Sequence, residues 1–274
     1  MARKKEKLVT KQAVVREDCV TGLRRLEKGS AFLGIADPPY NFGQEYDAYE
    51  DNLKHDEYLA WTRTWLEAMT HALHKHGSLW IFAPDEWVSE IDLLARKEFK
   101  YYKQNHIVWY FTFGQAQQKK FTRSHCHLLW LSRTKTRFTF NADPLRVPSA
   151  RQAIYKDKRA NAPGKLPDDT WVLYKHQLEP LFKPDADTWL MSRICGTFKE
   201  REPTSPNQIP IPMMERIIRA TSDEGDLVVD AFCGTGSAGV ACAIHNRSYV
   251  GYDLSQACVR QATNRIAETL KRVG

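Results

Sequence analysis

The chain has no apolar run near the roughly 20 residues that a membrane-spanning helix requires. It opens MARKKEKLVTKQ, without the apolar core of a signal peptide. Its six cysteines contain no CxxC pair, which argues against a disulfide framework and a thiolate metal motif. Internal repeats and low-complexity tracts are also missing. These absences predict a cytoplasmic protein with reduced thiols and no membrane partner.

The composition is that of an ordinary globular protein. The chain has 274 residues, of which 42% are hydrophobic and 27% are charged, so it is long enough for one large domain. Lys and Arg number 40 against 33 acidic residues, a formal charge of +7. This excess favours a polyanionic partner such as nucleic acid, although a basic surface without such a partner is equally compatible with the charge alone.

Apolar runs of strand length alternate with stretches of helical period, which predicts an α/β fold. Strands are expected over residues 13–18, 32–37 and 77–84, and an apolar stripe over residues 58–73 predicts a helix that ends at Gly77. HIVWYF and HCHLLWLS predict an antiparallel pair, so the sheet should be mixed. Six prolines interrupt the pattern between residues 143 and 198, which indicates an inserted segment.

A glycine-rich turn follows the buried strand LVVD near the end of the chain. Glycines at Gly234 and Gly236 let the backbone turn tightly against a ligand before a helix begins. Asp253 ends the next strand about 20 residues later, where a ribose diol would need a bidentate acceptor. The turn lacks the third glycine of a dinucleotide fingerprint and the lysine of a phosphate loop. An ordinary strand-to-helix turn is the alternative, and a nicotinamide dehydrogenase is disfavoured.

The second motif is Asp37-Pro38-Pro39-Tyr40, directly after a predicted strand. Two prolines remove two backbone donors and leave carbonyl acceptors beside a carboxylate and an aromatic ring. The exocyclic amino group of a base could donate to Asp37 and to the Pro38 carbonyl while Tyr40 stacks on the ring. A Pro-Pro turn with a capping Asp is the structural alternative.

With DPPY about 195 residues before the FxGxG-type turn, the chain resembles the permuted beta class of S-adenosylmethionine-dependent DNA amino-methyltransferases. The resemblance implies a Rossmann-like, circularly permuted, seven-stranded mixed sheet flanked by helices, with an inserted target-recognition region. It divides the chain into a basic tail (1–12), a catalytic part (13–142), a target-recognition insertion (143–200) and a cofactor-binding part (201–274) of the same methyltransferase domain.

The resemblance also assigns roles to residues. It implies catalysis by Asp37, Pro38, Pro39 and Tyr40. It implies S-adenosylmethionine binding, with the adenine near Asp18, by Asp18, Cys19, Asp37, Gln208, Asp230, Phe232, Cys233, Gly234, Thr235, Gly236, Ser237, Asp253 and Leu254.

A basic region lies between the two motifs. Residues 96–137 hold ten Lys or Arg against Glu98 alone, a local charge of +9, which favours salt-sensitive contacts with phosphates; a solvated basic face is the alternative. We expect contacts with DNA from Asn41, Lys119, Lys120, Arg123, Arg146, Ser149, Arg151, Lys156, Lys158 and Arg159.

The functional hypothesis is methylation of adenine N6 in double-stranded DNA after base flipping. Asp as the first motif residue favours adenine over cytosine N4. RNA adenine methylation and a catalytically silent nucleic-acid binder are further alternatives. At the family level we expect a bacterial, archaeal or phage-encoded enzyme, associated with the nucleoid through DNA, a homodimer, and a restriction endonuclease counterpart.

A metal site is not expected. On a strand, His125 and His127 would share one face with Cys126 opposite, and the sequence identifies no third ligand.

Overall fold

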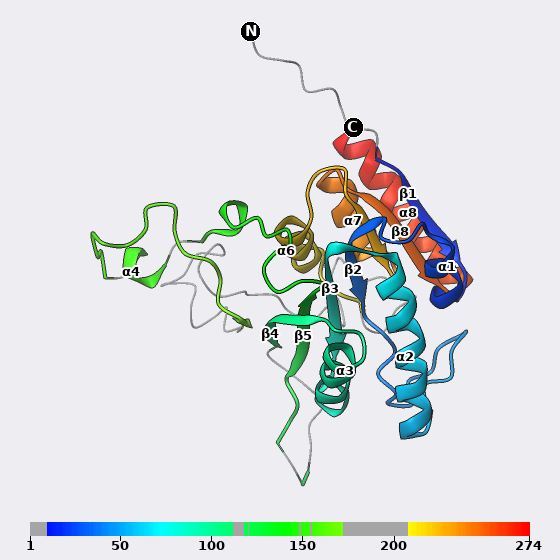
Figure 1. Ribbon diagram of the computed structural model, residues 1–274. Coiled ribbons are helices and arrows are strands. Elements are labelled where there is room, and N and C mark those ends of the chain that lie inside the picture. The colour runs from blue at the N-terminus through cyan, green and yellow to red at the C-terminus, as the bar shows by residue number, and fades with distance from the viewer. Residues whose placement is uncertain (1–9, 112–117, 120, 148, 154, 172–207) are drawn as a thin grey trace.

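The computed structural model describes residues 10–111, 118–119, 121–147, 149–153, 155–171 and 208–274, and its strands form one sheet with helices on both faces (Figure 1). The elements, in chain order, are β1 (Gln12–Arg16), α1 (Cys19–Arg25), β2 (Ala31–Ala36), α2 (His55–Ala72), β3 (Leu73–Ala83), α3 (Asp85–Lys97), β4 (Tyr102–Tyr110), β5 (His125–Ser132), the 3-10 turn η1 (Asp143–Leu145), α4 (Ala150–Ala153), β6 (Thr170–Trp171), α6 (Ile211–Thr221), β7 (Leu227–Asp230), α7 (Ser237–Ile244), β8 (Ser248–Asp253) and α8 (Gln256–Val273). Within the described ranges, no helix is both long and apolar enough to cross a bilayer.

The sheet is mixed, as predicted. Its strand order is β1-β8-β7-β2-β3-β5-β4-β6. The strands from β1 to β3 in this order run parallel, and β5 is antiparallel to both β3 and β4. Seven strands correspond to the predicted sheet, and the two-residue β6 adds a short edge beside β4.

The two ends of the chain interleave in this sheet. Strands β7 and β8 insert between β1 and β2 (Figure 1). The register places Ile35 opposite Asp230, and the Ala231 N–H donates to the Ile35 carbonyl at 3.0 Å. Because parallel strands finish at the same edge, the segments after β2 and after β7 become neighbours.

Each face of the sheet is covered by its own helices. Helices α1, α2 and α3 bury side chains such as Leu23 and Trp65 on one face. Helices α6, α7 and α8 bury Ile217, Ala241 and Ile266 on the other. Apolar burial on both faces explains why the central strands read as almost continuous apolar runs in the sequence.

Two tryptophans join the sheet to α6. Trp80 on β3 and Trp130 on β5 are direct neighbours in the register, and their rings stack with centroids 5.6 Å apart. The Trp80 Nε1–H donates to the Thr221 hydroxyl on α6 at 3.1 Å. Both indoles therefore pack in the same core, and the Trp80 N–H has a hydrogen-bond partner there.

The predicted end of the long helix at Gly77 is wrong. Helix α2 ends at Ala72, and β3 begins at Leu73 because Leu73 already pairs with Ala31 of β2. Gly77 lies beside an irregularity in this pairing, where an added Cβ would come within 3.0 Å of the His74 carbonyl. Sheet pairing therefore overrides the helical period here, and the glycine permits a close backbone approach.

Replacing Trp80 with Ala should destabilise the fold. The substitution removes a buried indole and leaves a cavity between the sheet and α6, which typically costs about 3–5 kcal/mol of unfolding free energy. Urea unfolding would measure the loss. The matched control is Leu93→Ala on α3, where the side chain is 51% exposed, and its effect should stay within about 0.5 kcal/mol. A Trp80→Ala loss no larger than the control would contradict this account of the core.

Candidate active site

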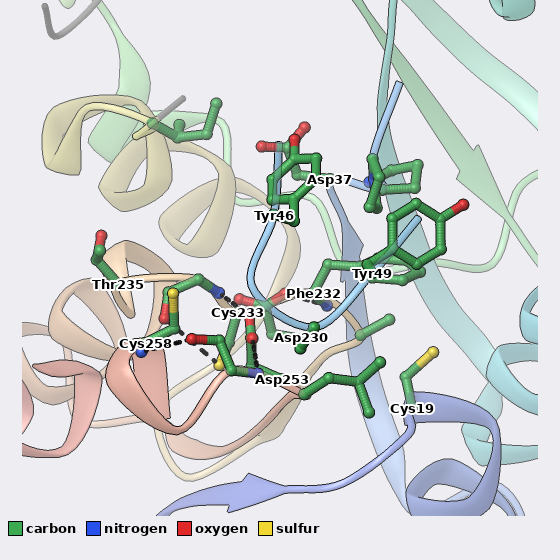
Figure 2. A pocket seen from close by; sticks show the side chains of 18 of the residues that line it. Cys19, Asp37, Tyr46, Tyr49, Asp230, Phe232, Cys233, Thr235, Asp253 and Cys258 are labelled. Atoms are coloured by element: carbon green, nitrogen blue, oxygen red, sulfur yellow. Dashed lines mark hydrogen bonds between the residues drawn. The ribbon is translucent and has the colours of Figure 1, made fainter. Parts of the chain in front are cut away.

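Four carboxylates gather along one edge of the sheet. Asp37 follows β2, Asp230 ends β7, Asp253 ends β8, and Asp18 caps the helix that follows β1. All four line a cavity of about 340 Å³, a size typical of small-molecule sites. Figure 2 shows three of them, Asp37, Asp230 and Asp253. The cavity lies at the carboxyl ends of parallel strands, where α/β proteins bind ligands.

The structure brings the two sequence motifs together around this cavity. It is lined by every predicted catalytic and cofactor residue except Gly236, namely Asp18, Cys19, Asp37, Pro38, Pro39, Tyr40, Gln208, Asp230, Phe232, Cys233, Gly234, Thr235, Ser237, Asp253 and Leu254. Gly236 has a left-handed φ of 80°, and an added Cβ would come within 2.7 Å of the Ala262 Cβ on α8. Gly236 therefore shapes the turn from behind the cavity.

Asp253 holds the glycine turn in place. One carboxylate oxygen accepts the Gly234 N–H at 2.9 Å, and the other accepts the Ser255 N–H at 2.8 Å. Burial raises the pKa of Asp253, and these two backbone donors oppose that shift. An added Cβ at Gly234 would meet no protein atom within 4 Å, so open space remains beside the turn that Asp253 fixes.

Asp230 is oriented into the protein as well as toward the cavity. It is 3% exposed, and its carboxylate accepts the Tyr249 hydroxyl at 3.1 Å and the Phe232 N–H at 3.3 Å. Burial raises the pKa of Asp230 to about 7, and the nearby Asp37 adds to the effect. These contacts hold the end of β7 in place.

The catalytic motif is held from three sides. The Tyr40 hydroxyl donates to Asp37 at 2.9 Å, and the Cys126 thiol on β5 lies 3.4 Å from the same hydroxyl. Tyr58 donates to the Pro39 carbonyl at 2.8 Å, and Trp87 donates to the Tyr40 carbonyl at 2.9 Å. These contacts fix the position of the motif within the fold.

A loop that the sequence left unassigned crosses the cavity. Tyr46, Asp47 and Tyr49 line it, and Figure 2 shows both tyrosines opposite Asp253. The Ser255 hydroxyl donates to Asp47 at 2.7 Å, which joins this loop to the start of α8. Tyr46 and Tyr49 follow the DPPY motif within ten residues. These two aromatic residues were the sequence signal that could have indicated the loop's place at the cavity.

The predicted DNA-contacting residues occupy varied surroundings. Asn41 bonds to the Leu53 backbone at 2.6 and 2.8 Å, and Ser149 is buried. Arg151 and Arg159 both pair with Asp157, whose pKa these arginines lower. Arg146 pairs with Asp143; Lys119, Lys156 and Lys158 are exposed, and Lys120 lies outside the described residues. Contact of these residues with DNA stays a prediction.

The alternation predicted for the His-Cys-His strand is confirmed. Cys126 faces Tyr40, whereas the Nε2 atoms of His125 and His127 lie 2.8 and 2.5 Å from one Asp85 oxygen. The sequence identifies no third ligand beside these histidines, whereas the fold brings Asp85 on α3 within reach of both. The Arg123 guanidinium also contacts Asp85 at 3.5 Å, so this carboxylate is already engaged by cationic and histidine groups.

The fold, and the cavity at the edge of its permuted sheet, together define an α/β methyltransferase. A family model described as DNA methylase matches residues 33–264, and the chain belongs to this DNA methylase family, whose members methylate amino nitrogens. DNA is therefore its substrate class.

Individual relatives agree with the family. The chain is 31% identical over 255 residues to the type II methyltransferase M.HpaI of Haemophilus parainfluenzae, covering 93% of this chain and 74% of that one. It is 28% identical over 258 residues to the DNA adenine methyltransferase YhdJ of Escherichia coli K12, covering 93% and 82%.

Solved structures show the same fold. The crystal structure of the M1.HpyAVI complex with S-adenosylmethionine has a TM-score of 0.59 at 18% identity, over 93% of this chain and 98% of that chain. The cytosine-N4-specific PvuII DNA methyltransferase has a TM-score of 0.62 at 13% identity, over 96% and 93%. These likenesses confirm the architecture of the sheet.

Asp253→Asn should weaken cofactor binding. An amide cannot accept both the Gly234 and the Ser255 N–H, so one backbone donor loses its partner and the turn loosens. We expect the Kd for S-adenosylmethionine to rise about tenfold or more, as measured by calorimetry. The matched control is Asp226→Asn. Asp226 directly precedes β7, at the end of the strand opposite Asp230, and its substitution should leave the Kd unchanged. Equal affinities for the two variants would disprove the role given to Asp253.

Proposed function

We propose that this protein methylates the N6 amino group of adenine in double-stranded DNA. The observation that carries the proposal is the Asp37–Tyr40 pair on the wall of the cavity: a carboxylate acceptor beside an aromatic residue, whose hydroxyl donates to Asp37 at 2.9 Å. Asp as the first residue of the motif, and the name of the 28% identical adenine methyltransferase relative, support adenine. Cytosine N4 is the competing target, because its amino group suits the same acceptor.

The cavity fits S-adenosylmethionine. The open space beside Gly234 would suit the methionine part. Asp253 and Asp18 both line the cavity, and we assign the ribose to Asp253 and the adenine to the side of Asp18. When bound, the cofactor supplies an activated methyl group on a sulfonium. The amino nitrogen gains the methyl carbon as the carbon–sulfur bond breaks, the bonding electrons stay on sulfur, and the nitrogen releases one proton.

The side chains of the DPPY motif would prepare the amino group for this step. Asp37 accepts one N–H and so directs the nitrogen lone pair toward the methyl group, which is chiefly a positioning effect. Tyr40 stacks on the extruded base and offsets part of the few kcal/mol that flipping costs. Burial raises the pKa of Cys19 and Cys126 to about 12, so both stay neutral thiols and a covalent thiolate mechanism is disfavoured.

The partners and location follow the same family resemblance. We propose a homodimeric, cytoplasmic enzyme that associates with the nucleoid through DNA. A restriction endonuclease counterpart is supported by the name of the relative M.HpaI, a type II methyltransferase. Residues 143–200 would read the recognition sequence.

The labelled nucleoside decides the target base. After incubation with tritiated S-adenosylmethionine and mixed-sequence duplex DNA, digestion should yield label in N6-methyl-2′-deoxyadenosine. Asp37→Ala is the matched control and should transfer no label, because the amino group loses its acceptor. Label in N4-methylcytosine would replace adenine with cytosine as the target. Label in neither nucleoside would favour RNA methylation or a silent binder.

Activity should rise with pH through the titration of Asp37. Burial raises the pKa of Asp37 to about 7, and the bond from Tyr40 opposes the shift. The carboxylate is a stronger N–H acceptor and a stronger base than the protonated acid, so kcat/KM for the cofactor should fall by up to about tenfold per pH unit below that pKa and level off above it. Tyr40→Phe keeps the ring but removes the opposing bond, so its rising limb should move to higher pH. A flat profile in the wild-type enzyme would rule out Asp37 as the acceptor.

A further inference from the structure

Phe42 places a large apolar ring on the surface beside the catalytic motif. Its side chain is 49% exposed, and its ring lies edge-on to Tyr40 with centroids 6.0 Å apart. Tyr40 lines the cofactor cavity, whereas Phe42 is not among the residues that line it. Single exposed aromatics are common on protein surfaces, so the case for Phe42 depends on how the turn that carries it is built.

A buried carboxylate organises that turn. Asp51 is 4% exposed, and its two oxygens accept the backbone N–H groups of Asn41, Phe42 and Gln44 at 2.7, 3.0 and 3.0 Å. Asn41 adopts a left-handed φ of 59°, and its side chain bonds the Leu53 backbone twice. The ring is therefore presented by a pre-organised turn.

A cation holds the ring itself. The Arg123 guanidinium lies 5.1 Å from the Phe42 ring centroid, within cation–π range. Arg123 is in turn held by Asp85 and Glu86 at the start of α3. The position of Phe42 is thus restrained through both its backbone and its ring.

We propose that Phe42 is a wedge that enters the DNA stack at the position vacated by the flipped base. Extruding a base leaves a gap in the duplex, and proteins that unstack DNA often insert an apolar side chain between base steps. Tyr40 receives the base inside the cavity, and Phe42, two residues later, stays outside on the duplex side. The inference rests on the DNA methylase activity and is independent of which base is methylated.

If Phe42 is a wedge, its removal should lower kcat/KM on fully paired DNA only. The recognition motif is first mapped by sequencing DNA methylated by the wild-type enzyme. Two oligonucleotide duplexes are then compared, one fully paired and one with an abasic site opposite the target base, where flipping is cheaper. Phe42→Ala should lower kcat/KM on the paired duplex roughly tenfold to a hundredfold, and the abasic duplex should restore most of that loss.

Three controls keep the result specific. The Kd of Phe42→Ala for S-adenosylmethionine should match that of the wild-type enzyme, and Phe42→Trp should keep activity on paired DNA. Tyr102→Ala removes a ring that is 47% exposed at the start of β4. This variant should keep the wild-type kcat/KM on both duplexes. An equal loss by Phe42→Ala on both duplexes, or no loss on the paired one, would overturn the wedge. The ratio of kcat/KM on the two duplexes does not depend on which base is methylated. A wrong target assignment would therefore leave this ratio unchanged.

Discussion

The parallel pairing of β2 with β7 is the contact on which the site depends. It joins segments from the two ends of the chain and places the residues after Ile35 beside those after Asp230. The Ala231 N–H bond to the Ile35 carbonyl continues this pairing to the edge of the sheet. Without it, the acidic diproline motif and the glycine turn would each be an ordinary loop.

This pairing places the partly buried Asp37 near the buried Asp230. Desolvation raises the pKa of both Asp37 and Asp230 to about 7, well above the value near 4 of an unfolded chain. Between these values the folded protein binds protons that the unfolded chain has released, so this contribution to stability falls as pH rises from about 4 to about 7. A sulfonium cation in the cavity would favour both carboxylates. The two raised pKa values therefore lower the stability of the free protein at neutral pH, and a bound cation would offset part of that loss.

The loop after the DPPY motif has residues on both sides of the cavity wall. Asp47 bonds to Ser255 and brings Tyr46 and Tyr49 across the cofactor cavity. Asp51 instead rigidifies the turn around Phe42 on the outer side. One short segment thus lines the cavity with two tyrosines and holds an exposed apolar ring outside it.

The sequence by itself determined the class of fold, the order of most strands and helices, and the residues of both motifs, because apolar periodicity and turn-forming residues report local burial. It also pointed to Asp253, which now lies within hydrogen-bonding distance of Gly234. Only the tertiary structure decided where α2 gives way to β3, which group meets His125 and His127, and which loop covers the cavity. Each of these outcomes depends on strand register or on contacts between distant segments, such as the bond between Asp47 and Ser255, 208 residues apart. A local pattern records which side chains are buried, but the register of the folded sheet decides which of them meet.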